Sequence, residues 1–129
     1  MTEPVWILDE VAQALHSILL SEHGGGTGIR DKALLESALS RPKQKYNYEP
    51  TTSFFELAAA YSFGIVNNHP FVDGNKRTAF TIGTVFLEIN GIVLIASEPD
   101  AAITFERLAA GKVSEEDLAK WFDENSQRA

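Results

Sequence analysis

The segment TSFFELAAAYSFGIVNN, residues 52–68, constrains the fold more than any other part of this chain. Ser53 and Glu56 have the spacing of a capping box, which predicts that a helix begins there. The residues that follow are apolar on nearly every side of that helix, and such a helix is stable only when other elements surround it. We therefore expect a central helix with the rest of the chain packed around it.

Two further helices are predicted before the central one. The first begins at Asp9 and ends near Gly24, in a glycine-rich stretch that is interpreted as a loop. The second is capped by Asp31 and ends before Pro42, because proline disrupts a helix interior. Apolar residues recur at helical spacing in both. The predicted inner stripes are Val11, Leu15, Ile18 and Leu19 on the first helix and Leu34, Leu35, Ala38 and Leu39 on the second.

Polar sequence separates the second helix from the central one. Residues 42–52 contain two prolines and two tyrosines, which predicts an exposed loop or a short hairpin. After the central helix, a second buried helix is expected to begin near Asn75. It should end at Asn90 and Gly91, a typical helix-stop pair.

The C-terminal part is predicted to contain one short extended run, residues 92–96, and then two helices capped at Ser97 and Ser114. A length of 129 residues suits one hydrophobic core and is too short for two ordinary ones. We therefore expect a single all-α domain over residues 1–129, a compact helical bundle with at most one small β-hairpin.

Composition limits the classes of partner. Eleven Lys and Arg against 18 Asp and Glu give a net charge of −7, which argues against direct binding to nucleic acid or to an anionic membrane. The chain has no cysteine, and therefore neither a disulfide framework nor a thiolate metal site. No run approaches the roughly 20 apolar residues of a membrane span, and the N-terminus lacks a basic leader. We expect a soluble, cytoplasmic protein.

The stretch HPFVDGNKR, residues 69–77, lies between the two buried helices and is rich in chemically active groups. A helix that begins near Asn75 presents unpaired backbone N–H groups and the positive end of its dipole, which together favour an anion. Gly74 allows the main chain to approach a ligand closely, and Lys76 and Arg77 add full positive charges. The pattern therefore predicts a phosphate site.

Two more residues complete the set that phosphoryl transfer needs. Asp73 offers a hard oxygen ligand for Mg²⁺, which binds few carboxylates and completes its shell with water and phosphates. His69 offers an imidazole that can accept a proton near physiological pH. Each residue taken alone also fits a structural role in a turn. His16 and His23 have no metal-spaced companions and are interpreted as structural.

This stretch resembles the signature of the Fic/Doc family, roughly H-x-F-x-[DE]-G-N-[GK]-R-x-x-R. The segment GIRDKALLESALSRP, residues 28–42, is similar to one that recurs in the death-on-curing, or Doc, branch. The resemblance implies a Fic fold in which the motif loop joins two central helices and residues 45–52 form a flap that pairs with a target peptide. The residues that match the signature position by position are His69, Phe71, Asp73, Gly74, Asn75, Lys76 and Arg77.

The resemblance also implies roles for these residues. His69 would be the base that accepts the proton of the target hydroxyl, and Asp73 would hold Mg²⁺. Phe71 would be structural. Gly74, Asn75 and Arg77 would surround the transferred phosphate, and Lys76 would join them in binding ATP. The catalytic residues implied in this way are His69, Asp73, Lys76 and Arg77.

Departures from the signature bear on the group that is transferred. Lys76 stands where adenylylating members usually carry glycine, and Phe80 stands where they carry the second arginine. Both favour the Doc branch, whose members pass the γ-phosphate of ATP to a threonine of elongation factor Tu and stop translation. Gly74 matches the glycine of the adenylylating members, whereas Doc carries an alanine at this position. Transfer of AMP therefore stays open.

The resemblance finally implies a regulator. Many relatives carry an inhibitory helix of the form [ST]-x-x-x-E-[GN], and Thr52 with Glu56 has this spacing, but Leu57 follows where Gly or Asn is needed. A separate Phd-like antitoxin acting in trans is therefore expected, as in a type II toxin-antitoxin system. Three functions remain: a toxin kinase, a protein adenylyltransferase, and a non-catalytic protein-binding module with a vestigial anion nest.

Overall fold

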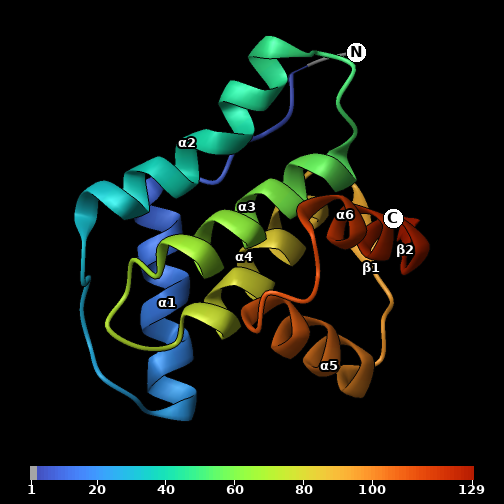
Figure 1. Cartoon of the computed structure of the whole chain (residues 1–129). Coiled ribbons are helices and arrows are strands. Elements are labelled where there is room, and N and C mark those ends of the chain that lie inside the picture. Colours follow the sequence, from blue (N-terminus) through green and yellow to red (C-terminus); the bar gives the residue numbers. More distant parts are fainter. Residues whose placement is uncertain (1–2) are drawn as a thin grey trace.

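Helices α3 (Phe54–Asn68) and α4 (Asn75–Ile89) lie side by side in the middle of the molecule (Figure 1). The computed structural model describes residues 3–129. Helices α2 and α6 pack on α3, α1 packs on α4, and α5 contacts both central helices. The side chain of Ser53 accepts a hydrogen bond from the Glu56 N–H at 3.1 Å, so α3 begins where the capping pattern predicted. The prediction of a central helix is confirmed, with eight of its residues buried: Leu57, Ala58, Ala59, Ala60, Tyr61, Ser62, Gly64 and Ile65.

Helix α1 (Asp9–His23) has the predicted bounds but a different buried face. Val11 and Ile18, which were predicted to face inward, are 38% and 54% exposed. The two buried residues of α1 are Ala12 and His16. The prediction was wrong at these positions because two neighbouring stripes of α1 have the same helical period, and only the packing partner selects between them. The selected stripe places a histidine in the interior.

Helix α2 (Lys32–Tyr48) is longer than predicted. Asp31 caps its start by accepting from the Leu34 N–H at 3.0 Å. The helix then continues through Pro42, so the exposed loop predicted from that residue is wrong as far as Tyr48. The predicted flap over residues 45–52 is wrong for residues 45–48, which are helical, whereas residues 49–52 lie outside the helix. A proline removes only its own N–H bond. Here its ring is fully buried, and this packing holds the helix together across the missing bond.

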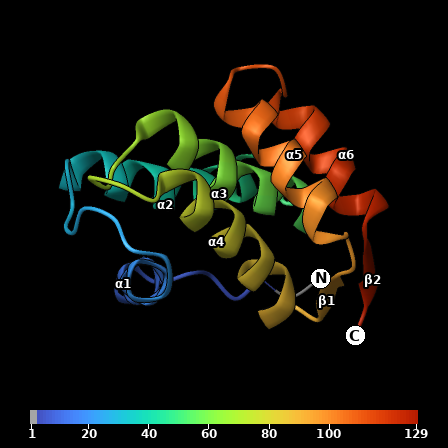
Figure 2. The same ribbon diagram turned by 90° about the horizontal axis from the view of Figure 1, so that it is seen from below.

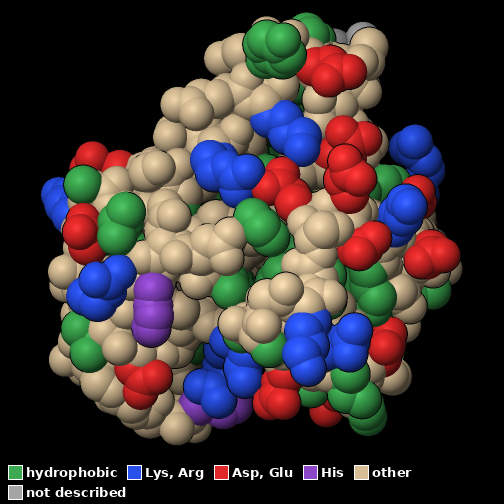
Figure 3. Space-filling view, in the orientation of Figure 1, with side chains coloured by type: hydrophobic (Ala, Val, Ile, Leu, Met, Phe, Trp, Pro, Cys, Tyr) green, Lys and Arg blue, Asp and Glu red, His purple; other side chains and the backbone are tan. Residues whose placement is uncertain are grey.

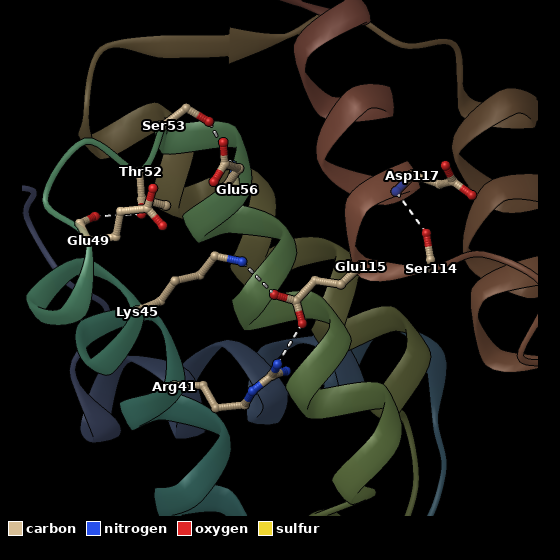
Figure 4. A network of polar contacts seen from close by, with 9 residues as sticks. All are labelled: Arg41, Lys45, Glu49, Thr52, Ser53, Glu56, Ser114, Glu115 and Asp117. Atoms are coloured by element: carbon tan, nitrogen blue, oxygen red, sulfur yellow. Dashed lines mark hydrogen bonds and ion pairs between the residues drawn. The ribbon is translucent and has the colours of Figure 1, made fainter.

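Ion pairs to α6 (Glu115–Glu124) hold the last two turns of α2 in place (Figure 4). Arg41 Nη2 lies 2.6 Å from one carboxylate oxygen of Glu115, and Lys45 Nζ lies 3.1 Å from the other. These contacts join residues 70 or more positions apart. No local sequence pattern therefore contains these contacts of the last two turns of α2.

The small β element joins distant segments. Strands β1 (Ile92–Leu94) and β2 (Ser126–Arg128) are antiparallel, with Ile92 opposite Arg128 and Leu94 opposite Ser126, and they lie together at one edge of the molecule (Figure 2). The helical fold class is confirmed. The predicted extended run is confirmed for Ile92–Leu94, but its partner is not a neighbouring hairpin arm.

The last two helices begin as their capping patterns predict. Helix α5 (Glu98–Ala109) is capped by Ser97, which accepts from the Asp100 N–H, and Ser114 caps α6 in the same way. No helix within residues 3–129 is long and apolar enough to cross a membrane.

Two glycines allow close packing of the central helices. A Cβ on Gly64 of α3 would lie 3.3 Å from the Cα and the Cβ of Ala38 on α2. A Cβ on Gly83 of α4 would overlap the Ser62 hydroxyl and lie 2.9 Å from the Phe122 ring. The close approach of α3 and α4 sets the separation of the two helix ends that the motif loop connects.

Candidate active site

The motif loop joins the end of α3 to the start of α4 and borders a pocket of about 500 Å³. On the face shown in Figure 3, Lys and Arg side chains gather where α4 begins and α5 ends, whereas the rest of the face mixes both signs of charge. All six predicted site residues line this single pocket, together with Val66 and Ala109. They are His69, Asp73, Gly74, Asn75, Lys76 and Arg77.

His69 ends α3 in a strained backbone conformation. Its φ and ψ of 51° and 53° are left-handed, and it is the only non-glycine residue with positive φ among residues 3–129. Such a conformation costs on the order of 1–3 kcal/mol and is typical of functional sites. Arg30 stabilises it, because its Nε donates to the His69 carbonyl at 2.7 Å and its Nη2 donates to the Asn68 carbonyl at 2.9 Å. A guanidinium at this position also complements the negative end of the α3 dipole.

The Asn75 side chain is turned into the loop. Its Oδ1 accepts from the Phe71 N–H at 3.0 Å, and its Nδ2 donates to the Phe71 carbonyl at 2.9 Å. The same Nδ2 lies 2.8 Å from Nδ1 of His69. Because the backbone of Phe71 sets the orientation of the amide, Nδ1 of His69 must accept this hydrogen bond. A neutral His69 therefore carries its own hydrogen on Nε2 in this arrangement.

Asp73 rests against the glycine-rich loop that follows α1. Its Oδ1 accepts from the Gly74 N–H at 2.8 Å and its Oδ2 accepts from the Gly26 N–H at 3.3 Å. A Cβ on Gly25 would come within 2.6 Å of Oδ2, so the loop needs glycine here. Each carboxylate oxygen keeps lone pairs for a cation. Within residues 3–129 no three His, Cys, Asp or Glu side chains form a metal-binding group. Asp73 could hold Mg²⁺ if water and phosphate oxygens supplied the other ligands.

The start of α4 is open. Gly74 precedes the helix with φ 78° and no side chain caps it, and the first helical bond runs from the Thr78 N–H to the Gly74 carbonyl at 2.9 Å. In the described part of the chain, no acceptor is paired with the N–H groups of Asn75, Lys76 or Arg77. These three amides are the anion nest that the sequence predicted, and they border the pocket.

The charges at this helix start are also available. Lys76 Nζ lies 3.3 Å from Oε1 of Glu106, and both side chains are well exposed, so water weakens this pair. Arg77 forms no ion pair within residues 3–129. Two cations in the first turn oppose the helix dipole unless an anion is bound. The arrangement can bind a phosphate with backbone and side-chain donors together.

Comparisons with known proteins show the family of this chain. A family model described as the Fic/DOC family matches residues 6–87. The chain is 34% identical over 106 residues to "Protein kinase doc" of Escherichia phage P1, which covers 82% of this chain and 83% of that protein. It is 40% identical over 74 residues to "Toxin Doc" of Mycolicibacterium smegmatis, which covers 57% of each chain. The chain belongs to the Fic/Doc family.

The sequence did not single out the residues that hold the loop from outside. Arg30 lies in the segment similar to the Doc branch, but nothing local shows that its side chain reaches the end of α3. Its backbone N–H also bonds the Pro70 carbonyl at 2.7 Å, and the Val72 N–H bonds the Gly28 carbonyl at 3.1 Å. Residues 28–31 thus run beside the motif loop and brace it. His16, interpreted as structural, contacts the loop from α1.

Proposed function

We propose that this protein is a Doc-like toxin kinase that transfers the γ-phosphate of ATP to a Ser or Thr hydroxyl of a target protein. The observation that carries the proposal is that one pocket is bordered by His69, by Arg77 and by the start of α4, where three N–H groups have no partner within residues 3–129. The likeness to a protein named "Protein kinase doc" supports it. The proposed target is elongation factor Tu, which would place the action in the cytoplasm and stop translation.

The start of α4 would bind the phosphate that is transferred. The N–H groups of Asn75, Lys76 and Arg77 belong to the first turn of α4, and the N–H groups of a first turn point out of the N-terminal end of a helix. Donors fixed in this way favour a developing negative charge. The Arg77 guanidinium can bind two oxygens in a fork, whereas Lys76 adds a point charge. Asp73 would hold Mg²⁺, which neutralises phosphate charge when bound.

His69 would orient the target hydroxyl and accept its proton at Nε2. In the arrangement described above, Nε2 carries the hydrogen, so His69 must first adopt the tautomer with its hydrogen on Nδ1. That change breaks the contact with Asn75, and binding of nucleotide or target must compensate for it. Nitrogen chemical shifts of the imidazole measured with and without ATP would show the exchange, and an Nε2–H form that persists in the ternary complex would rule out the base role.

Phe80 supports a kinase over an adenylyltransferase. Its ring packs edge-on against Phe105 of α5, with 5.2 Å between centroids, and it does not line the pocket. The position therefore supplies no second phosphate clamp. Gly74 does not discriminate, since a Cβ there would meet only ordinary contacts at 3.7–3.8 Å and its φ of 78° alone favours glycine.

Labelled ATP tests the proposal. The purified chain is added to a translation extract with ATP labelled at the γ-phosphate or at the α-phosphate, and the modified proteins are separated and identified. Label from the γ position alone is expected, and a His69→Ala variant should transfer none. Label from the α position alone would establish adenylylation. No label from either, with toxicity that survives His69→Ala, would favour the binding module.

We propose that a separate Phd-like antitoxin restrains the enzyme. Thr52 and Glu56 lie at the start of α3, where the Thr52 hydroxyl donates to the Glu49 carbonyl at 2.6 Å (Figure 4). His69 lies at the other end of a 15-residue helix, about 22 Å away. These two residues therefore cannot inhibit the pocket of their own chain. Titration with the antitoxin should raise helical circular dichroism as its disordered segment folds, and unchanged helicity would contradict this mode.

A further inference from the structure

His16 is a buried polar residue that the proposed mechanism does not use. Its side chain is only 4% exposed, at the centre of the inner face of α1. It lines a separate pocket of about 380 Å³ between α1 and residues 25–29, and it does not border the pocket of His69. A histidine buried among apolar residues needs a hydrogen-bond partner, and the identity of that partner indicates its role.

The ring of His16 contacts the motif loop in two ways. Its Nε2 lies 2.8 Å from the backbone oxygen of Asp73. A carbonyl oxygen can only accept, so Nε2 carries a hydrogen and donates it. The flat face of the same ring stacks on Phe71, with 3.8 Å between centroids and 9° between planes. One side chain of α1 thus holds both the apolar anchor of the loop and the backbone two residues later.

The bond to Asp73 sets the direction of a peptide group. The peptide that joins Asp73 to Gly74 is planar and trans, so its C=O and N–H point in opposite directions. Fixing the carbonyl toward α1 therefore turns the Gly74 N–H away from α1. That N–H is the donor to Oδ1 of Asp73 at 2.8 Å. The orientation of the Asp73 carboxylate and of the residues that open α4 follows from this one peptide plane.

We infer that His16 is a positioning residue for the phosphate and Mg²⁺ end of the site. It acts from α1 through the peptide between Asp73 and Gly74, without touching either ligand. The inference rests on the proposed function only where it predicts a change in the KM for ATP. The structural part, that His16 sets the Asp73–Gly74 peptide, stands apart from which group is transferred.

Matched substitutions separate the hydrogen bond from simple packing. Gln places an amide nitrogen near the position of Nε2, whereas Asn is shorter and does not reach the Asp73 carbonyl. His16→Gln and His16→Asn thus introduce the same amide group and differ only in the length of the side chain. His16→Phe is the complementary variant, because it keeps a ring for stacking on Phe71 and removes the donor.

The first measurement needs no activity. In ¹⁵N-labelled protein, the amide resonance of Gly74 should move in His16→Asn and in His16→Phe, and it should stay near the wild-type position in His16→Gln. The second measurement is the KM for ATP at several Mg²⁺ concentrations. Loss of one neutral hydrogen bond predicts a KM roughly three- to tenfold higher for Asn and Phe, with Gln near wild type.

The outcomes are distinct. A wild-type Gly74 resonance and KM in the Asn and Phe variants would overturn the inference. So would equal losses in all three variants that follow their melting temperatures, because these would show a packing role only. If the wild type transfers no phosphate at all, the proposed function fails, and the Gly74 resonance still decides the role of His16.

Discussion

The starts of the two central helices contrast sharply. At the start of α3, Ser53 accepts a hydrogen bond from the Glu56 N–H, and an acidic residue lies in the first turn. At the start of α4, Gly74 supplies no cap, three N–H groups lack a partner in the described residues, and the first turn carries two cations. Asp31, Ser97 and Ser114 cap α2, α5 and α6 in the same way. The start of α1 also has no side-chain cap, but its first turn carries two acidic residues and no cation. The start of α4 thus combines an uncapped end with two cations at the border of the pocket, which is expected where an anionic ligand completes the bonds.

Arg77→Ala should give the largest effect of the substitutions that test this contrast. Removing a donor that meets a developing charge costs about 10²- to 10³-fold in kcat. The unfolding free energy should rise by about 0.3–1 kcal/mol in this variant, because a cation in the first turn opposes the helix dipole. Steady-state kinetics and urea unfolding measure the two effects. A variant with lower stability and full activity would place Arg77 among structural residues.

Tyr61→Phe tests a backbone N–H that has a hydrogen-bond partner, in contrast to those at the start of α4. The Tyr61 hydroxyl accepts from the buried Ile7 N–H at 3.0 Å. Leaving that N–H without a partner should cost about 1–3 kcal/mol of unfolding free energy.

The same residue predicts a pH dependence. Burial raises the pKa of Tyr61 from 10.0 to about 12, against the smaller lowering effect of the Ile7 bond. The folded state therefore favours the neutral phenol, and this stabilisation is complete below pH 10 and lost between pH 10 and about 12. Urea unfolding of wild type and Tyr61→Phe should show a difference that narrows across this range. A constant difference would contradict the role of burial.

Arg30→Gln tests how the end of α3 is held. Without the guanidinium, the carbonyls of Asn68 and His69 lose two donors and the left-handed conformation of His69 loses its support. We expect kcat to fall roughly tenfold, which corresponds to about 1.4 kcal/mol, with little change in the KM for ATP. Arg30→Lys is the control, since it keeps the charge and loses the fork. Equal activity in all three proteins would show that the loop holds His69 without Arg30.

Ser53→Ala gives the smallest effect and completes the comparison. Loss of this cap should cost about 1 kcal/mol of unfolding free energy and leave phosphate transfer unchanged, because the capped end of α3 is remote from the pocket. Thermal unfolding and the labelled-ATP assay measure the two. A fall in activity larger than the fall in folded protein would contradict the separation of capped and open helix starts.

Much of the candidate site was predictable because its residues are neighbours in the chain. His69 to Arg77 occupy nine consecutive positions, and the short loop between α3 and α4 brings them to one pocket. The residues that support the loop were not predictable in the same way. Arg30 and His16 are 39 and 57 positions from the backbone atoms they bind, so nothing in their local sequence indicates these contacts.

The sequence by itself determined the features that depend on residues within about four positions of each other. These are the helix caps at Asp31, Ser53, Ser97 and Ser114, the helix stop near Gly91, and the run of motif residues. Tertiary structure alone decided which stripe of α1 is buried, how far α2 continues beyond Pro42, and which segment pairs with β1. Local patterns report the bonds that a segment can make with itself. The choice among equivalent faces, lengths and partners is made by side chains that meet only when the chain is folded.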